Sequence, residues 1–211
     1  RDFTPVTGIA ATGFVLAVHP SVAAHTVQEL IALAKQKPGA LNFGSGGTGS
    51  PAHLIGEMFR MQTGVNMVHV PYKTVAEAVT DVIAGQVHTM FVVSTAAMPQ
   101  IGAGRIRGLG VTSLKRSPVV PDLPTLDEQG LPGFEATAWY SFIAPAGTRR
   151  AIIDRLHEEV VKDIELPDVG KRFATLGLDP MPLPPDEMGR FMKTELEKWK
   201  KVAEAAKANA R

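Results

Sequence analysis

The feature that most constrains the fold is a glycine-rich loop at residues 41–54, LNFGSGGTGSPAHL. The run from Leu41 to Phe43 has the short apolar character of a buried strand. Ser50 and Pro51 suit the N-cap and the first position of a helix. Free amides at a helix N-terminus, together with the helix dipole, favour an anion. The stretch therefore predicts a strand, an anion-binding loop and the start of a helix.

Six consecutive loop residues, and one histidine beyond them, are candidates for holding this anion. Glycines let a ligand approach the main chain closely, and hydroxyls surround the first amides of the helix. His53 lies three residues into the helix, where its ring either points a nitrogen at the cleft or only packs. The loop candidates are Ser45, Gly46, Gly47, Thr48, Gly49 and Ser50.

Three kinds of anion compete for the loop. Gly44, Gly46 and Gly49 formally match the dinucleotide fingerprint G-x-G-x-x-G, which makes a nucleotide-dependent α/β enzyme the alternative function. That fingerprint also requires an acidic residue at the end of the next strand, and none follows Val70. A P-loop requires a lysine after its last glycine, where this chain has Ser50. A carboxylate remains possible, because it needs only a few amides and hydroxyls. The other interpretation that stays open is that the glycines form a tight turn that holds no ligand.

Composition and the absence of known motifs point to binding without a cofactor. The chain has 211 residues, 45% of them apolar, a formal charge of +1 and no cysteine. Its near-neutral charge argues against a nucleic-acid partner, and the lack of cysteine removes thiolate metal sites and cysteine nucleophiles. The sequence contains neither His-Glu-x-x-His nor Gly-x-Ser-x-Gly. We therefore expect no metal, no cofactor and no catalytic residues.

Apolar runs alternate with helical patterns over the first 112 residues, which predicts an α/β fold with a parallel sheet and right-handed crossovers. In such a sheet, ligands lie beyond the carboxyl ends of the strands. Tyr72, Lys73 and Ser94 follow strand ends, so we expect them to face the same cleft as the loop, although a loop lysine is commonly just solvated. The expected strands are 14–18, 41–43, 65–70, 87–93, 106–112 and 136–144, with helices starting near 26, 51, 74, 148, 168 and 185.

The second half of the chain reads as part of another body. Prolines concentrate in residues 114–134, which is typical of a connection between two bodies. Trp139, on the strand that follows, either forms a wall for the ligand or fills a core. One strand and three helices do not make an α/β domain alone, and the opening at Arg1 lacks the pattern of a signal peptide. We therefore expect that an N-terminal part of this body is absent.

Several motifs, in order along nearly the whole chain, resemble one family, the Bug or TctC solute receptors of tripartite tricarboxylate transporters. These motifs are LNFGSGGTGSPAHLIGEMF, VNMVHVPYK, VIAGQVHTMF, GRIRGLGVTSLKRSPVVPDLPTLDEQGLPGFEATAWYSFIAPAGT and ELEKWKKV. The resemblance implies a periplasmic binding protein of the type II kind, with two lobes that close on a small carboxylate. It also implies membrane transporter subunits as partners and a periplasmic location.

The resemblance also implies a division of the chain and a ligand class. Residues 1–13 would cross over from an incomplete first lobe, 14–134 would form the complete second lobe with the glycine loop, and 135–211 would return to the first lobe. Family members often carry an acidic residue where this chain has Val92 or Val93. A buried ammonium group needs an acceptor, so we expect a dicarboxylate or an aromatic acid in preference to an amino acid.

Overall fold

The computed structural model describes residues 2–118 and 120–209. The chain divides into two compact units. The first unit comprises Arg1–Thr12 and Ala138–Lys200, and the second comprises Gly13–Thr137 and Lys201–Arg211. The end of the C-terminal helix, which we expected in the first lobe, thus groups with the second unit.

The second unit is built on a mixed β-sheet in the order β3-β2-β4-β1-β5. The strand β2 is parallel to both β3 and β4, whereas β1 is antiparallel to both β4 and β5. The five strands are β1 (Phe3–Val18), β2 (Asn42–Ser45), β3 (Val68–Pro71), β4 (Thr89–Val93) and β5 (Arg107–Val111).

The strand β1 departs from the expectation in two ways. It runs antiparallel to its neighbours, pairing Val15 with Val92 and with Val111, within a sheet that the alternation of elements predicted to be mainly parallel. It also begins at Phe3, so most of residues 1–13 form strand where only a crossover was expected. An apolar run does not encode strand direction, and small or polar residues such as Thr7 and Gly8 interrupt the apolar pattern of the early part of β1.

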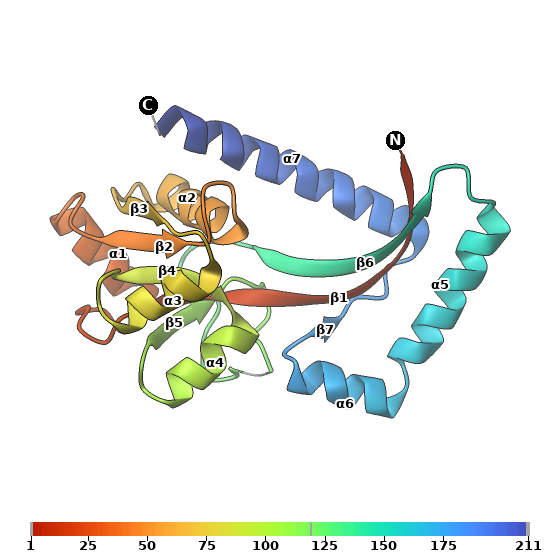
Figure 1. The fold of residues 1–211 in the computed structure, drawn as a ribbon, viewed down its shortest axis with the longest axis horizontal. Coiled ribbons are helices and arrows are strands. Elements are labelled where there is room, and N and C mark those ends of the chain that lie inside the picture. The colour runs from red at the N-terminus through yellow and green to blue at the C-terminus, as the bar shows by residue number, and fades with distance from the viewer. Residues whose placement is uncertain (1, 119, 210–211) are drawn as a thin grey trace. The chain divides into compact units, whose positions relative to one another are not determined.

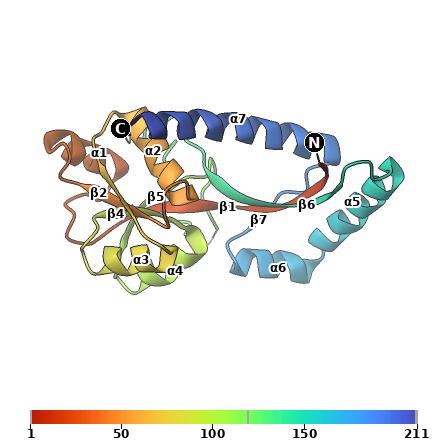
Figure 2. The same ribbon diagram turned by 45° about the horizontal axis from the view of Figure 1, so that its top comes forward.

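Four helices cover the sheet of the second unit, with α2 and the pair α3 and α4 on opposite faces of β2 and β4 (Figures 1 and 2). Three of them begin near the residues that the sequence predicts, and the hydroxyls of Thr26, Ser50 and Thr74 cap them, each accepting an amide three residues on. Pro99 lies inside α4 and does not interrupt it. The helices are α1 (Val27–Gln36), α2 (Pro51–Thr63), α3 (Val75–Ile83) and α4 (Ser94–Gly102).

The first unit carries fewer strands, and two of its helices, α5 and α7, are longer than α1 to α4. Its strands β6 (Thr137–Pro145) and β7 (Asp179–Pro180) both pair with β1. Its small core joins Val6, Ala144 and Ile153. None of the helices in the described part of the chain is both long and apolar enough to cross a bilayer. The helices here are α5 (Arg150–Ile164), α6 (Pro167–Thr175) and α7 (Pro185–Asn209), the last of which ends in the second unit.

Candidate ligand-binding site

The glycine loop connects β2 to α2 at the carboxyl edge of the parallel strands. Because β2, β3 and β4 run in the same direction, the loop, the turn after β3 and the start of α4 share this edge. The loop also packs against α3, since a Cβ at Gly46 would lie 2.8 Å from Val75 Cγ2. Gly46 is therefore required by protein packing, whereas the sequence suggested close approach of a ligand.

Hydrogen bonds within the loop use several of its polar groups. The Gly47 amide donates to Ser45 Oγ at 3.1 Å, and the Gly49 amide donates to His53 Nδ1 at 3.0 Å. The Ser50 hydroxyl accepts the His53 amide at 3.4 Å, as an N-cap does. Gly47 and Gly49 have φ of 114° and 83°, values that glycine adopts without strain. The loop is thus shaped by its own contacts.

Two loop amides remain open for a ligand. Among the described residues, neither Gly46 nor Thr48 has an acceptor for its backbone N–H, and the Thr48 hydroxyl also has no partner. Thr48 is exposed and Gly46 is half-buried. Both amides precede the positive N-terminal end of α2, which begins at Pro51. This arrangement can hold one small anion through backbone amides and a hydroxyl.

Two candidates at the neighbouring strand ends have their hydroxyls engaged within the protein. The Tyr72 hydroxyl donates to Asp81 Oδ2 at 2.7 Å, and partial burial together with this carboxylate raises the pKa of Tyr72 to about 12. The Ser94 hydroxyl is fully buried and donates to the Gly13 carbonyl at 2.8 Å. Lys73 is exposed and forms no ion pair among the described residues. Of these three side chains, Lys73 is the one free to meet an anion.

Trp139 is the candidate that lies in the first unit. Its ring packs edge-on against Phe191, with centroids 5.6 Å apart and an interplanar angle of 80°. Within the described residues, no group of three or more His, Cys, Asp or Glu side chains has an arrangement that suits a metal ion. The anion site is therefore described from residues of the second unit, to which the glycine loop belongs.

A stack of three rings beneath the loop was not predicted. Phe43, His69 and His53 stack in that order, with centroid separations of 5.0 Å and 4.1 Å. Burial lowers the pKa of both histidines, that of His69 to about 4, where the neighbouring His53 adds to the shift. The stack depends on the pairing of Phe43 with His69 across β2 and β3, which no local pattern reveals.

Comparison with known proteins identifies the family. Residues 1–207 match TctC, described as the tripartite tricarboxylate transporter family receptor. The chain belongs to this family. The match confirms the family that the sequence motifs indicate, together with the α/β fold of a type II periplasmic binding protein.

Relatives and solved structures agree with this assignment. A UPF0065 protein from the tcbD-tcbE intergenic region of Pseudomonas sp. (strain P51) is 37% identical over the whole chain, which spans 63% of that relative's length. A structure of R. palustris Rpa4515 with adipate is 36% identical, with a TM-score of 0.84 over 98% of this chain and 69% of the other. MatC from Rhodopseudomonas palustris with bound malate is 27% identical, with a TM-score of 0.78 over 95% and 69%.

Proposed function

We propose that the chain carries the anion-holding part of a periplasmic receptor that captures a small carboxylate and delivers it, chemically unchanged, to membrane transporter subunits. The observation that carries the proposal is the pair of open amides at Gly46 and Thr48, before the N-terminus of α2. Membership of the receptor family supports the role in transport and the periplasmic location. The adipate and malate bound to two similar structures support the carboxylate.

The residues around the loop favour a dicarboxylate, or an aromatic acid, over an amino acid. Asp81 is engaged with Tyr72, and Glu77 accepts the Lys73 amide at 3.3 Å. The strand β4 ends at Val93 and offers no further carboxylate for a ligand ammonium group. Lys73 is exposed beside the loop and suits a second negative charge. We therefore rank an aliphatic dicarboxylate first.

Calorimetric titration of the full-length protein with adipate, malate, benzoate, aspartate and glutamate tests this proposal. We expect heat from the dicarboxylates and little from the two amino acids. Thr48→Ala removes one hydrogen bond to a charged group and should weaken adipate binding by about 1.5–3 kcal/mol. Thr80→Ala is the matched control, because Thr80 lies on an exposed part of α3 and bonds only to the Ala76 carbonyl.

The same titration separates the proposal from its rival. Binding of NAD or ATP would favour the nucleotide-dependent enzyme, and tight binding of aspartate or glutamate alone would contradict the ligand class. Chemical change of the bound acid in a stoichiometric incubation would contradict a purely receptor role.

A further inference from the structure

We propose that His53 and His69 are positioning residues that hold the anion loop in its binding conformation without themselves contacting the ligand. This inference rests on the proposed function, because it assigns these rings a role in carboxylate affinity. It concerns the underside of the loop, where the rings meet the polar groups that the loop does not present to a ligand.

His53 fixes the second half of the loop. It is 8% exposed, and its Nδ1 accepts the Gly49 amide at 3.0 Å. Only an unprotonated Nδ1 accepts a hydrogen bond, so this contact requires the neutral ring with its proton on Nε2. The contact holds Gly49 in its left-handed conformation, with φ at 83°. Any side chain without an acceptor at this point leaves the Gly49 amide unpaired.

His69 fixes the first half of the loop through Ser45. Its Nε2 lies 2.7 Å from Ser45 Oγ, which is fully buried. The same hydroxyl lies 3.1 Å from both the amide nitrogen and the carbonyl oxygen of Gly47. The ring thus orients the hydroxyl that closes the turn around Gly47. The two histidines together engage the amides that flank the open amide of Thr48.

Close packing against Phe43 and the helix α2 restrains the ring of His69. The pairing of β2 with β3 places Phe43 opposite His69, and the two rings stack. Phe43 in turn lies against the backbone of α2, because a Cβ at Gly56 would lie 2.3 Å from Phe43 Cε2. Because the His69 ring contacts both the Phe43 ring and the His53 ring, it has little freedom to move.

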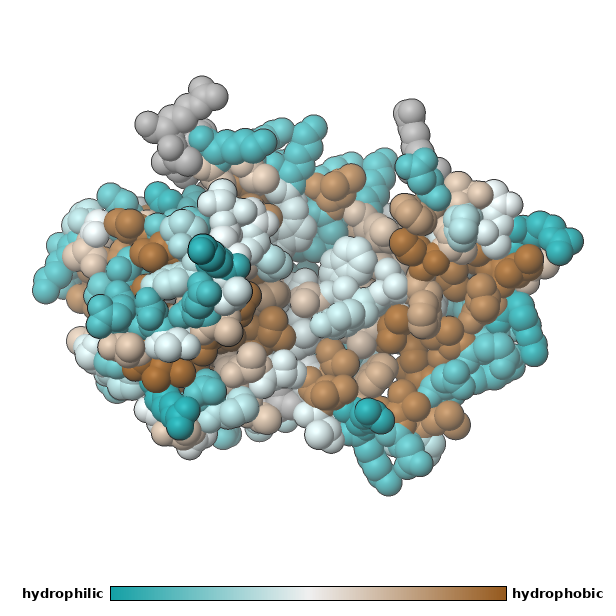
Figure 3. Space-filling model, in the orientation of Figure 1, coloured by the Kyte–Doolittle hydropathy of each residue, from teal (hydrophilic) through white to brown (hydrophobic). Residues whose placement is uncertain are grey.

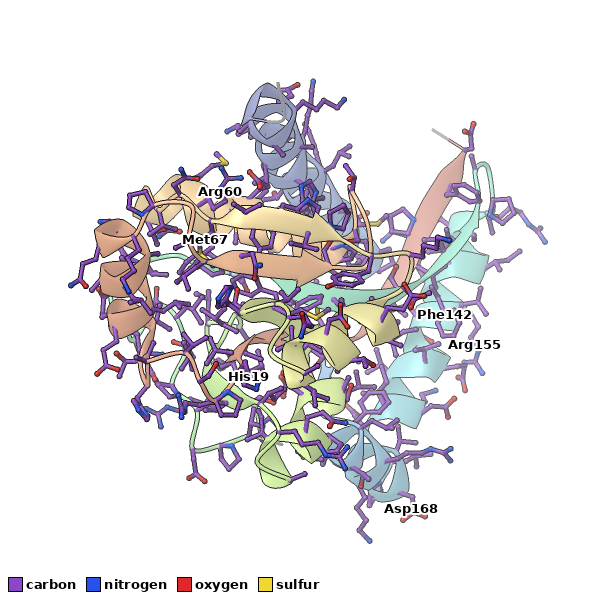
Figure 4. The ribbon with its side chains drawn as sticks, turned by 60° about the vertical axis from the view of Figure 1, so that its left-hand side comes forward. His19, Arg60, Met67, Phe142, Arg155 and Asp168 are labelled. Carbon is purple, nitrogen blue, oxygen red and sulfur yellow. The ribbon has the colours of Figure 1, made fainter. Side chains whose placement is uncertain are left out.

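The charged groups around the rings leave both of them neutral near pH 7. Glu57 and Arg60, on the same face of α2 as His53, form an ion pair of 2.7 Å, and Glu57 is 2% exposed. These side chains, His53, His69 and Ala206 of α7 share the lining of a pocket of about 400 Å³. Figure 4 shows Arg60 on α2 near Met67, which also lines the pocket. Burial lowers the pKa of both histidines, which favours the neutral His53 ring that the Gly49 contact requires.

Paired substitutions test the positioning role. The side-chain amide of asparagine places a polar atom where histidine has Nδ1, and that of glutamine places one where histidine has Nε2. His53→Asn and His69→Gln therefore keep a hydrogen-bonding atom in place, whereas His53→Gln and His69→Asn misplace it. We expect the misplaced variants to bind adipate about ten-fold more weakly and the matched variants to stay within about three-fold of wild type. In the ligand-free protein, amide exchange should become about ten-fold faster at Gly49 in His53→Gln and at Gly47 in His69→Asn.

Each result judges the proposal separately from the proposed function. Equal adipate affinity and equal exchange within each pair would overturn the positioning role. If the wild type binds none of the titrated acids but the exchange pattern appears as expected, the proposed function and the role of the rings in affinity both fail, while their role in holding the loop in shape stands. Amide exchange at Leu109 in β5 shows whether each variant is folded. Because the His53 variants and the His69 variants are two independent pairs, the test stays decisive if one variant unfolds.

Discussion

The two units differ in how far their large apolar side chains are exposed to solvent. In the second unit Phe43, Phe59 and Phe134 are less than 2% exposed, and the last two belong to a cluster of rings with Phe91. In the first unit Phe142 is 51% exposed and apolar residues gather over β6, α5 and α6 (Figure 3). A loop that holds a ligand through a few amides needs a rigid support, and the unit that carries the loop is the one with the closed core.

The same contrast predicts that stability is unequal along the chain. Apolar side chains that stay in contact with solvent contribute little to the free energy of unfolding. The first unit leaves apolar residues of α5 and α7, and those that flank α6, at the surface. They include Ile152, Leu156, Leu166, Leu176 and Leu196, each more than 40% exposed. We expect amide exchange to be faster in the first unit than in the second.

Truncation of one phenylalanine in each unit is the strongest test of this comparison. Phe59→Ala opens a cavity in a closed core and should lower the free energy of unfolding by about 3–5 kcal/mol. Phe142→Ala removes a half-exposed ring on β6 (Figure 4) and should lower it by about 1 kcal/mol or less. Native-state hydrogen exchange at β4 and β6 measures both effects. Equal losses would show that the two units are packed equally well.

Two helical glycines give a matched pair of smaller effects with opposite sign. Gly56→Ala in α2 places a methyl group against the Phe43 ring and should destabilise the protein by about 1–3 kcal/mol. Gly170→Ala in α6 meets nothing within 4 Å and should stabilise the helix by about 0.5–1 kcal/mol. Urea unfolding of the two variants gives the comparison. Stabilisation by Gly56→Ala would contradict the proposed role of this glycine in seating the ring stack.

The pH dependence of stability tests the burial of His69 in the second unit. His69 has a pKa of about 4 in the folded protein against 6.5 for an unperturbed histidine, so the unfolded chain takes up a proton first as the pH falls. The stabilisation of the folded protein that depends on neutral His69 is therefore complete above pH 6.5 and is lost as the pH falls toward 4. The thermal midpoint of wild type should drop more over this range than that of His69→Gln. Parallel curves would mean that His69 does not titrate as its burial predicts.

The local features of the fold were predictable from the sequence. The caps at Thr26 and Ser50 and the loop between them follow from residue types at fixed positions, and the motif series led to the right family. The direction of β1 and its extension back to Phe3 were missed, because strand pairing is a property of the whole sheet. Local propensity carries no information about it.

The ring contacts of His69 could not be predicted either, because they also depend on strand pairing. His69 and Phe43 are distant in sequence and meet only through the register of β2 and β3. The packing of Gly46 against Val75 of α3 was likewise not predictable from the sequence, which indicated only that a ligand can approach the loop closely. The open amides followed from the loop motif, whereas the contacts that fix the loop required the folded structure.

The most direct test of the central claim is a titration of the ¹⁵N-labelled full-length protein with adipate, followed by NMR. The account predicts that the largest amide shifts occur at Gly46 and Thr48, the amides left open by the loop. Gly47 and Gly49, whose amides are engaged with Ser45 and His53, should shift less. Saturable binding of adipate that leaves the Gly46 and Thr48 amides unmoved would contradict the claim that this loop holds the carboxylate.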